Sequence, residues 1–388
     1  MNAHEPFFQQ ILPQLGNARL GVLCHPASVD DHLRHFAPRI MSEARRGQVV
    51  CFFGPQHGIR GEKQDNMIES ADFRDPVLNV PVYSLYGTTR QPTDEMFSHL
   101  DICIVDLQDI GQRVYTFIST LAYCMEAAAR LNKKILVLDR PNPVGGLKLE
   151  GNYVEENRRS FVGRFALPQR HGCTVGELAR LLQREFHLDC ELDVVPLKGW
   201  KRHEHALEWP ASHWVPPSPN IPTAYSAFAF LATVFLEGTN ISEGRGTTKP
   251  FEWIGAPFIE PDALAEALTQ SQCPGASFRP LYFQPTFHKW ANEVCGGVQM
   301  HITDPGVFEG FWTGIKLLEI LWKKYPEHMK WKEPPYEYEY KHLPIEFLLG
   351  SEALRVDVEK GVATAVWPER VEKDLAHFRK IRERYLLY

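Results

Sequence analysis

The chain of 388 residues is 44% hydrophobic and 23% charged, which is the composition of a soluble globular protein. Its formal net charge of -6 disfavours a polyanionic partner such as nucleic acid, and no run of about 18 apolar residues could span a membrane. The length exceeds that of one ordinary core and predicts two domains.

The first residues and the cysteines favour a cytoplasmic protein. Residues 1–6 lack the basic start and apolar core of a signal peptide. The eight cysteines are scattered without a CxxC pair, and Cys24, Cys51 and Cys103 lie in or beside apolar, strand-like runs. We therefore expect a reduced protein without a zinc site.

Short apolar runs alternate with helical patterns in the first half of the chain. Strands are expected at residues 18–24, 49–53, 80–87 with its turn, 102–105, 133–138 and 192–197. Helices are expected at 32–46 and 118–131, from 92 onward, and after Thr174, which forms a capping-box spacing with Glu177. This alternation indicates a parallel, doubly wound sheet.

A stiff segment separates the two predicted domains, 1–224 and 225–388. Residues 214–223 include Ser218 and Asn220 and carry four prolines, so they either end a domain or form a rigid binding wall. Beyond them, a helix at 225–236, a strand near 297–302 and helices at 310–325 and 371–388 predict a second, smaller α/β domain.

Polar side chains follow the predicted strand at 102–105. They are Asp106, Gln108, Asp109, Arg113 and Tyr115. In open α/β sheets, ligands bind beyond the carboxyl ends of the strands, so these residues are placed where a ligand would lie. Any one of them could equally cap a helix or form an ion pair, but the whole group exceeds what capping requires.

Three other loops have a similar composition, at residues 54–66, 139–146 and 237–252. The candidate side chains are Gln56, His57, Arg60 and Glu62 in the first loop, Asp139, Arg140 and Asn142 in the second, and Asn240, Glu243 and Arg245 in the third. The glycines in the first and third loops indicate tight turns or the close approach of a ligand. A turn-rich connector between domains is the alternative for the third loop.

The residues of these loops are compatible with few kinds of catalytic chemistry. The chain has no nucleophile elbow, no HExxH and no GxGxxG after the first strand. His57 and His171 are more simply structural than metal ligands, so we predict no metal. Several acids facing a polar cleft suit glycoside hydrolysis, and arginines beside them suit a substrate carboxylate or phosphate. The residues alone predict an enzyme acting on a small polar molecule.

Seven motifs resemble a bacterial family of exo-acting β-N-acetylmuramidases, formerly a family of unknown function. They lie, in family order, at residues 54–61, 83–87, 106–116, 138–143, 160–163, 218–223 and 237–248. The resemblance implies a Rossmann-like amino-terminal domain, a smaller carboxyl-terminal domain, a cleft between them and no NAD. It also implies removal of terminal N-acetylmuramic acid from peptidoglycan fragments.

One residue departs from the family pattern. The family usually has Pro-Glu-His-Gly where this chain has Gln56, and that glutamate is a candidate for the catalytic acid. An amide cannot donate a proton as a carboxylic acid does, so we predict a carboxylate pair drawn from Glu62, Asp106, Asp109 and Glu243, with Glu243 ranked first.

The resemblance also assigns the remaining side chains. Arg113 and Arg245 would bind the lactyl carboxylate of muramic acid, and His57 and Asn240 would orient sugar hydroxyls. The other predicted substrate-binding residues are Gln56, Arg60, Gln108, Tyr115, Asp139, Arg140, Asn142, Ser218 and Asn220.

Two rival functions stay open at this point. One is a sugar- or muropeptide-binding protein that has lost hydrolysis through Gln56. The other is an enzyme of different chemistry on a phosphorylated or carboxylated metabolite. The missing export signal favours intracellular turnover of wall fragments over action outside the cell. The sequence gives no basis for an oligomeric state.

Overall fold

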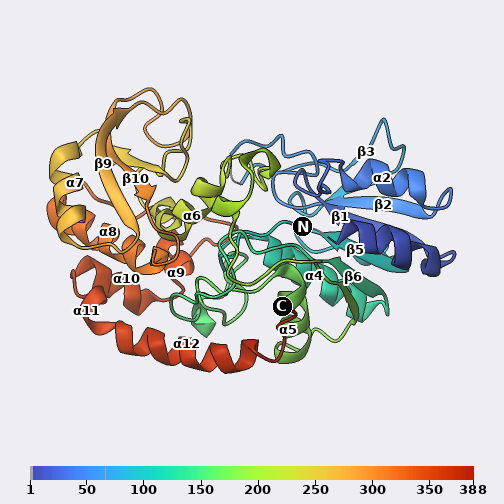
Figure 1. Cartoon of the computed structure of the whole chain (residues 1–388). Coiled ribbons are helices and arrows are strands. Elements are labelled where there is room, and N and C mark those ends of the chain that lie inside the picture. Colours follow the sequence, from blue (N-terminus) through green and yellow to red (C-terminus); the bar gives the residue numbers. More distant parts are fainter. Residues whose placement is uncertain (1–2, 66) are drawn as a thin grey trace.

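The computed structural model describes residues 3–65 and 67–388. Two α/β units lie side by side, one built on a seven-stranded sheet and the other on a three-stranded antiparallel sheet (Figure 1). The predicted fold class, a Rossmann-like parallel sheet followed by a smaller α/β unit, is confirmed.

The first sheet has the strand order β3-β4-β2-β1-β5-β6-β7 and is parallel apart from β3. Its strands are β1 (Leu20–Cys24), β2 (Val49–Gly54), β3 (Phe73–Arg74), β4 (Pro81–Ser84), β5 (Ile102–Asp106), β6 (Lys134–Leu138) and β7 (Glu191–Val195). The second sheet contains β8 (Trp253–Ala256), β10 (Cys295–Ile302) and β9 (Ala276–Phe283), in that order.

The helices connect and cover these strands. In the first unit they are α1 (His4–Pro6), α2 (Phe36–Glu43), α3 (Asp94–Ser98), α4 (Phe117–Arg130) and α5 (Val175–Glu185). Next come α6 (Ala224–Thr233), α7 (Pro261–Gln270), α8 (Gly310–Lys324), α9 (Pro344–Leu349), α10 (Glu352–Glu359), α11 (Ala363–Val366) and α12 (Pro368–Arg382). None of the helices in the described ranges is both long and apolar enough to cross a membrane.

Local sequence explains most of these boundaries. The predicted capping box is present before α5, where the Thr174 hydroxyl accepts a hydrogen bond from the Glu177 amide and the Glu177 carboxylate accepts one from the Thr174 amide. Thr93 caps α3 by accepting from the Met96 amide. The strands β3, β8 and β9 went unpredicted. The two residues of β3 are exposed and β9 has a single buried residue, so both lack a buried apolar run, and β8 is only four residues long.

Strand order reverses between β1 and β5, which is where a Rossmann-like sheet binds its ligand. Here a buried ion cluster lies at that position. Asp106 at the end of β5 is fully buried and accepts from Arg140 Nε at 2.6 Å, and its other oxygen lies 2.7 Å from His4 Nε2. Ser28 donates to the Asp106 carbonyl at 2.6 Å. Beside this cluster lies a hollow that is lined by Val29, Gln108 and Arg140, from the loops after β1, β5 and β6.

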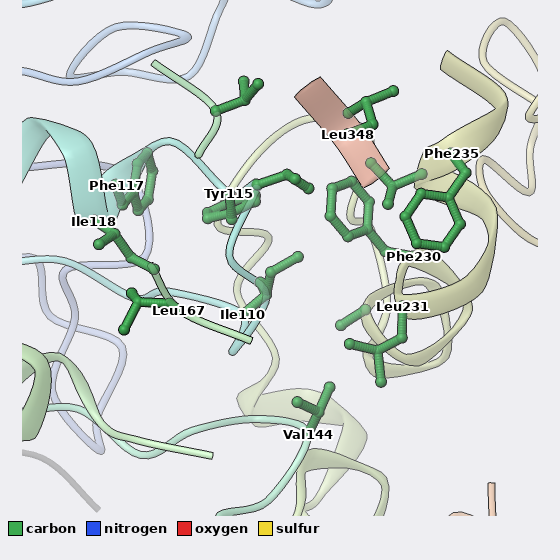
Figure 2. Packing of buried hydrophobic residues seen from close by; sticks show 14 of the residues in the cluster. Ile110, Tyr115, Phe117, Ile118, Val144, Leu167, Phe230, Leu231, Phe235 and Leu348 are labelled. Atoms are coloured by element: carbon green, nitrogen blue, oxygen red, sulfur yellow. The ribbon is translucent and has the colours of Figure 1, made fainter. Parts of the chain in front are cut away.

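The two units share one hydrophobic core. The loop after β5 presents Ile110 and Tyr115 toward α6 and the turn that follows it, and Figure 2 shows Tyr115 beside Phe230. The rings of these two residues meet edge to face, with centroids 6.1 Å apart. The chain then returns through α12 to the first unit, where its C-terminus lies by α5 (Figure 1). Loops of both units are thus held rigidly against each other.

The Asp106 ion cluster generates a prediction for stability. Asp106→Asn removes the negative partner of the buried Arg140 guanidinium, so the free energy of unfolding should fall by about 3–5 kcal/mol. Urea unfolding followed by circular dichroism measures this change.

The matched control is Asp101→Asn. Asp101 also pairs with an arginine, Arg19, at 2.8 Å, but both side chains are nearly half exposed. We expect a loss of about 0–1 kcal/mol there. Equal losses for the two variants would contradict the structural role given to Asp106.

Candidate active site

A cavity lies between the two units, beside the loops that follow β2 and β5. The volume of this cavity is about 50 Å³. The first unit contributes Gln56, His57, Val114, Tyr115, Thr116, Val162, Ser218 and Ile221, and the second contributes Phe230, Val234, Glu237, Arg245, Phe251, Tyr336 and Glu337.

Several residues around this cavity have a left-handed backbone. His57, Phe251 and Glu337 have φ values of 71°, 66° and 46°, although none is a glycine. Such conformations cost free energy and gather at functional sites, where the surrounding structure holds them. Gly111 makes a similar turn with φ of 79°, and a Cβ there would lie 2.4 Å from Asn142 Oδ1. That turn directs the following residues, Val114 to Thr116, to the cavity wall.

The carboxyl group of Glu337 is held at the wall by uncharged donors. The Tyr86 hydroxyl lies 2.9 Å from Oε1 and 2.8 Å from Oε2, and Gln56 Nε2 donates to Oε1 at 3.4 Å. Gln56 is fixed in turn by Thr116, whose hydroxyl donates to its Oε1 at 2.6 Å. Burial raises the pKa of Glu337 to about 7, against the opposing effects of Tyr86 and Arg90.

Arg245 is the buried cation of the cavity. Its Nη2 donates to Glu237 Oε1 at 2.7 Å, and Tyr336 donates to Glu237 Oε2 at 2.7 Å. Arg245 Nη1 has no hydrogen-bond partner among the described residues. A buried guanidinium with an unused N–H pair is able to bind an anionic group of a ligand.

Glu243 contacts Arg245 but does not line the cavity. Its Oε2 accepts from Lys289 Nζ at 2.8 Å, and its Oε1 lies 3.2 Å from Arg245 Nε and 3.5 Å from His288 Nδ1. Burial alone would raise its pKa, but Lys289, His288 and Arg245 hold the pKa well below its usual value. Glu243 therefore stays ionised and anchors Arg245.

His57 presents an unprotonated nitrogen to the site. Its Nδ1 donates to the Lys63 carbonyl at 2.7 Å, which places the proton on Nδ1 of the neutral ring. Burial lowers its pKa to about 4. The Nε2 of His57 is consequently an acceptor that can orient a ligand hydroxyl.

The other predicted acids lie away from the cavity. Asp106 belongs to the buried ion cluster at the sheet, and Asp109 Oδ1 accepts from the Gly111 amide at 2.6 Å and shapes the turn. Glu62 lines a separate hollow between the loops after β2 and β4. None of these carboxylates reaches the cavity, because each faces its own loop or the sheet.

The predicted binding residues divide in the same way. Gln56, His57, Tyr115, Ser218 and Arg245 line the cavity. The rest have contacts within the protein: Arg60 forms an ion pair with Asp75, and Arg140 forms one with Asp106. Gln108, Asn142 and Asn220 donate to the carbonyls of Pro141, Cys173 and Gln64, respectively, and Arg113 donates to three carbonyls. Asp139 caps α5, and Asn240 accepts from the Lys330 amide.

Arg113 is the clearest correction within this set. Its guanidinium is buried and donates to the carbonyls of Asn152, Leu167 and Leu348. Burial lowers its pKa to about 9. Since these carbonyls belong to both units, Arg113 joins the two units and is not placed to bind a substrate carboxylate.

Sequence reasoning missed Glu237, Tyr86, Tyr336 and Glu337 as individual site residues. Glu337 lies in a stretch of alternating tyrosines and glutamates that follows two prolines at 334–335. This alternation of aromatic and acidic residues in a loop was an available signal. Glu337 and Gln56 are 281 positions apart in the chain, so the sequence did not predict the contact between them.

No group of three or more His, Cys, Asp or Glu side chains among residues 3–65 and 67–388 could hold a metal ion. A second hollow, at the reversal of strand order, is lined by Gln108 and Arg140 among others.

Comparison with known proteins supplies the family. Residues 20–225 match the model of the N-terminal part of exo-β-N-acetylmuramidase NamZ, and residues 228–388 match that of its C-terminal part. The chain is 42% identical over 375 residues to the peptidoglycan β-N-acetylmuramidase NamZ of Bacillus subtilis (strain 168), which covers 97% of this chain and 88% of that protein.

Two crystal structures of DUF1343 family proteins from Bacteroides fragilis NCTC 9343 have the same fold. One gives a TM-score of 0.87 at 34% identity and the other 0.75 at 25% identity. Each comparison covers 100% of this chain and 98% of the other.

The anchoring role of Glu243 generates a second prediction. Glu243→Gln leaves two buried cations with one counter-charge fewer, and should lower the free energy of unfolding by about 3–5 kcal/mol. Adding Lys289→Met should restore part of this loss, with a coupling of about 0.5–3 kcal/mol in a double-mutant cycle. Urea unfolding of the four proteins gives the values.

Lys249→Met is the control from the same loop. Lys249 lies 3.2 Å from Glu252 but is 40% exposed, so its removal should cost about 0–1 kcal/mol. Additive effects of Glu243→Gln and Lys289→Met would contradict the pairing.

Proposed function

Because the chain belongs to the exo-β-N-acetylmuramidase NamZ family, we propose that it removes terminal N-acetylmuramic acid from peptidoglycan fragments in the cavity between its two units. The family predicted from the seven sequence motifs is confirmed, and the chain is a glycosidase. The proposal adds the substrate and the residues that act on it.

The unused N–H pair of Arg245 is the observation that supports muramic acid as the substrate. Muramic acid differs from glucosamine by a lactyl ether that ends in a carboxylate. Arg245 is buried in the cavity wall, is oriented by Glu237 and Glu243, and has Nη1 without a partner among the described residues. A lactyl carboxylate at Nη1 would complete its hydrogen bonding in a charge-assisted pair.

The reaction would use the carboxyl groups that line the cavity. Glycoside hydrolysis needs one carboxylic acid at the leaving oxygen and a second carboxylate at the sugar or at water. Glu237 and Glu337 are the two carboxyl groups among the described lining residues, and we propose them in place of a pair drawn from Glu62, Asp106, Asp109 and Glu243. His57 Nε2 would accept from a sugar hydroxyl.

The family supports exo action. Both matching family models are those of an exo-β-N-acetylmuramidase, so we propose that a terminal sugar binds at the cavity between the two units and that the departing saccharide extends through its mouth.

The cysteines support turnover inside the cell. All eight are buried free thiols, as in proteins of reducing compartments. We propose that the enzyme acts in the cytoplasm on imported wall fragments, as part of cell-wall recycling.

A second candidate function is binding without hydrolysis, and Gln56 is the observation that favours it. From the resemblance of the sequence motif we expect a glutamate at this position, whereas this chain has an amide, and an amide holds no transferable proton. The two candidates differ in one measurement, which is the release of 4-nitrophenol from 4-nitrophenyl N-acetyl-β-muramide.

The third prediction concerns specificity. Wild-type protein should cleave 4-nitrophenyl N-acetyl-β-muramide, and Arg245→Lys should lower kcat/KM for it by about 10- to 100-fold, since a charged hydrogen bond contributes about 1.5–3 kcal/mol. The variant should lose much less on the corresponding glucosaminide, which lacks the lactyl carboxylate. Release of nitrophenol measures both rates.

Arg60→Lys is the control, because Arg60 is an exposed arginine paired with Asp75 and lies off the cavity. Its kcat/KM should equal that of the wild type. An equal loss of kcat/KM for Arg245→Lys on both substrates would contradict the role of Arg245 in recognising the lactyl carboxylate. Binding of the muramide without any nitrophenol release would favour the second candidate.

A further inference from the structure

We infer that Glu337 is the general acid of this enzyme: a carboxyl group from the second unit takes the place at the cavity wall beside the amide of Gln56. This assignment rests on the proposed function and adds to it the residue that protonates the leaving oxygen. It also explains how hydrolysis can proceed with an amide at position 56.

The position of Glu337 is the first argument. Its side chain is only 4% exposed, yet it lines the cavity, and its backbone is held in the left-handed region with φ of 46°. A non-glycine residue is kept in this conformation only where neighbouring contacts enforce it. The contacts with Tyr86 and Gln56 belong to loops that follow β4 and β2 of the first unit. The carboxyl group is therefore fixed across the junction of the two units.

The hydrogen bonds around Glu337 suit an acid. Oε1 accepts from Gln56 Nε2, and the Tyr86 hydroxyl lies 2.9 Å from Oε1 and 2.8 Å from Oε2. Among the residues that the structure describes, Oε2 thus has no N–H donor, and a hydroxyl can accept as well as donate, so Oε2 is the oxygen that can carry a proton. Neither donor is charged, so neither forces the carboxyl group to ionise. Thr116 supports the arrangement by holding the amide of Gln56 from its other side.

The surrounding charges leave this group able to hold a proton at neutral pH. The titratable groups that face it are Arg90 above Tyr86, Glu237 and Tyr336 from the second unit, and the neighbouring Tyr338. Burial outweighs Arg90 and raises the pKa of Glu337 to about 7. Glu243, by contrast, is held ionised by Lys289 and Arg245. A group that is partly protonated near pH 7 is suited to proton transfer.

In the proposed step, the bond between the anomeric carbon and the glycosidic oxygen breaks, and the electron pair stays on the oxygen. That oxygen takes the proton from Glu337 Oε2 and leaves as a hydroxyl. Water supplies the hydroxyl that adds to the anomeric carbon. The proton that this water releases restores the acid form of Glu337, so no other reactant is needed.

The test compares two muramides with different leaving groups. A 4-nitrophenyl group departs as a stable anion without protonation, whereas N-acetylglucosamine must be protonated as it leaves. Glu337→Gln should lower kcat on the muramyl-N-acetylglucosamine disaccharide by about 10²- to 10⁴-fold, with a far smaller loss on the nitrophenyl muramide. Product release is followed by chromatography for the disaccharide and by absorbance for nitrophenol.

The pH profile is the second readout. Wild-type kcat/KM on the disaccharide should fall as the pH rises through about 7, because the acid form of Glu337 is lost. Tyr86→Phe removes a donor that stabilises the ionised carboxylate, so this fall should move to higher pH. Tyr86 is thus a positioning residue, and an unchanged pH profile in Tyr86→Phe would contradict that role.

Glu339→Gln is the control, because Glu339 lies on the same loop and outside the cavity lining. It should cleave both muramides as the wild type does, and thermal unfolding of each variant checks its folding. Equal losses of Glu337→Gln on both substrates, or none, would overturn the assignment of Glu337 while the proposed function stands. If the wild type cleaves neither muramide, the proposed function fails and the assignment fails with it.

Discussion

The burial of carboxylates is the constraint on which this structure depends. A carboxylate taken out of water needs a positive partner at contact distance, or it takes up a proton. Asp106 has Arg140 at 2.6 Å, and Glu243 has Lys289 at 2.8 Å. These pairs hold the sheet edge and the arginine of the cavity in place. Within residues 3–65 and 67–388, Glu337 has no such ion pair, and burial raises its pKa.

Asp139 shows that a raised pKa is not sufficient for a role in catalysis. Burial also raises its pKa, to about 6, and its partners are the Thr174 hydroxyl, the Gly176 amide and the Tyr388 hydroxyl. These donors belong to the start of α5 and to the C-terminus, away from any cavity lining. Asp139 therefore holds the C-terminal residue on the first unit, and placement at the cavity distinguishes Glu337 from it.

The sequence predicted the elements whose signals are local. The buried apolar run before Asp106 and the capping box of Thr174 and Glu177 each depend on neighbours within a few positions. It also predicted that the loops after β2 and β5 and the loop that follows α6 would contribute to one site. The cavity lining contains Gln56, Tyr115 and Arg245 from these loops.

Which side chain of a loop faces the cavity could not be predicted, because the direction depends on contacts between distant segments. Glu237 and Glu243 lie six positions apart in the chain, yet one lines the cavity and the other faces Lys289. Arg113 is surrounded by polar residues in sequence, but the packing of the second unit supplies a carbonyl from Leu348. Polar composition locates a functional loop, whereas the tertiary contacts select its functional residues.

The contact between positions 56 and 337 has a consequence for how the cavity titrates. Two carboxyl groups at the 3.4 Å that separates Gln56 Nε2 from Glu337 Oε1 would share a proton and titrate as a pair, with one pKa raised and the other lowered. An amide at position 56 leaves a single titrating group there and contributes a fixed donor to it. With Glu337 as the proposed general acid, the glutamine would confine the transferable proton to the carboxyl group of the second unit. Proton transfer would then require that both units be packed together as the shared core holds them.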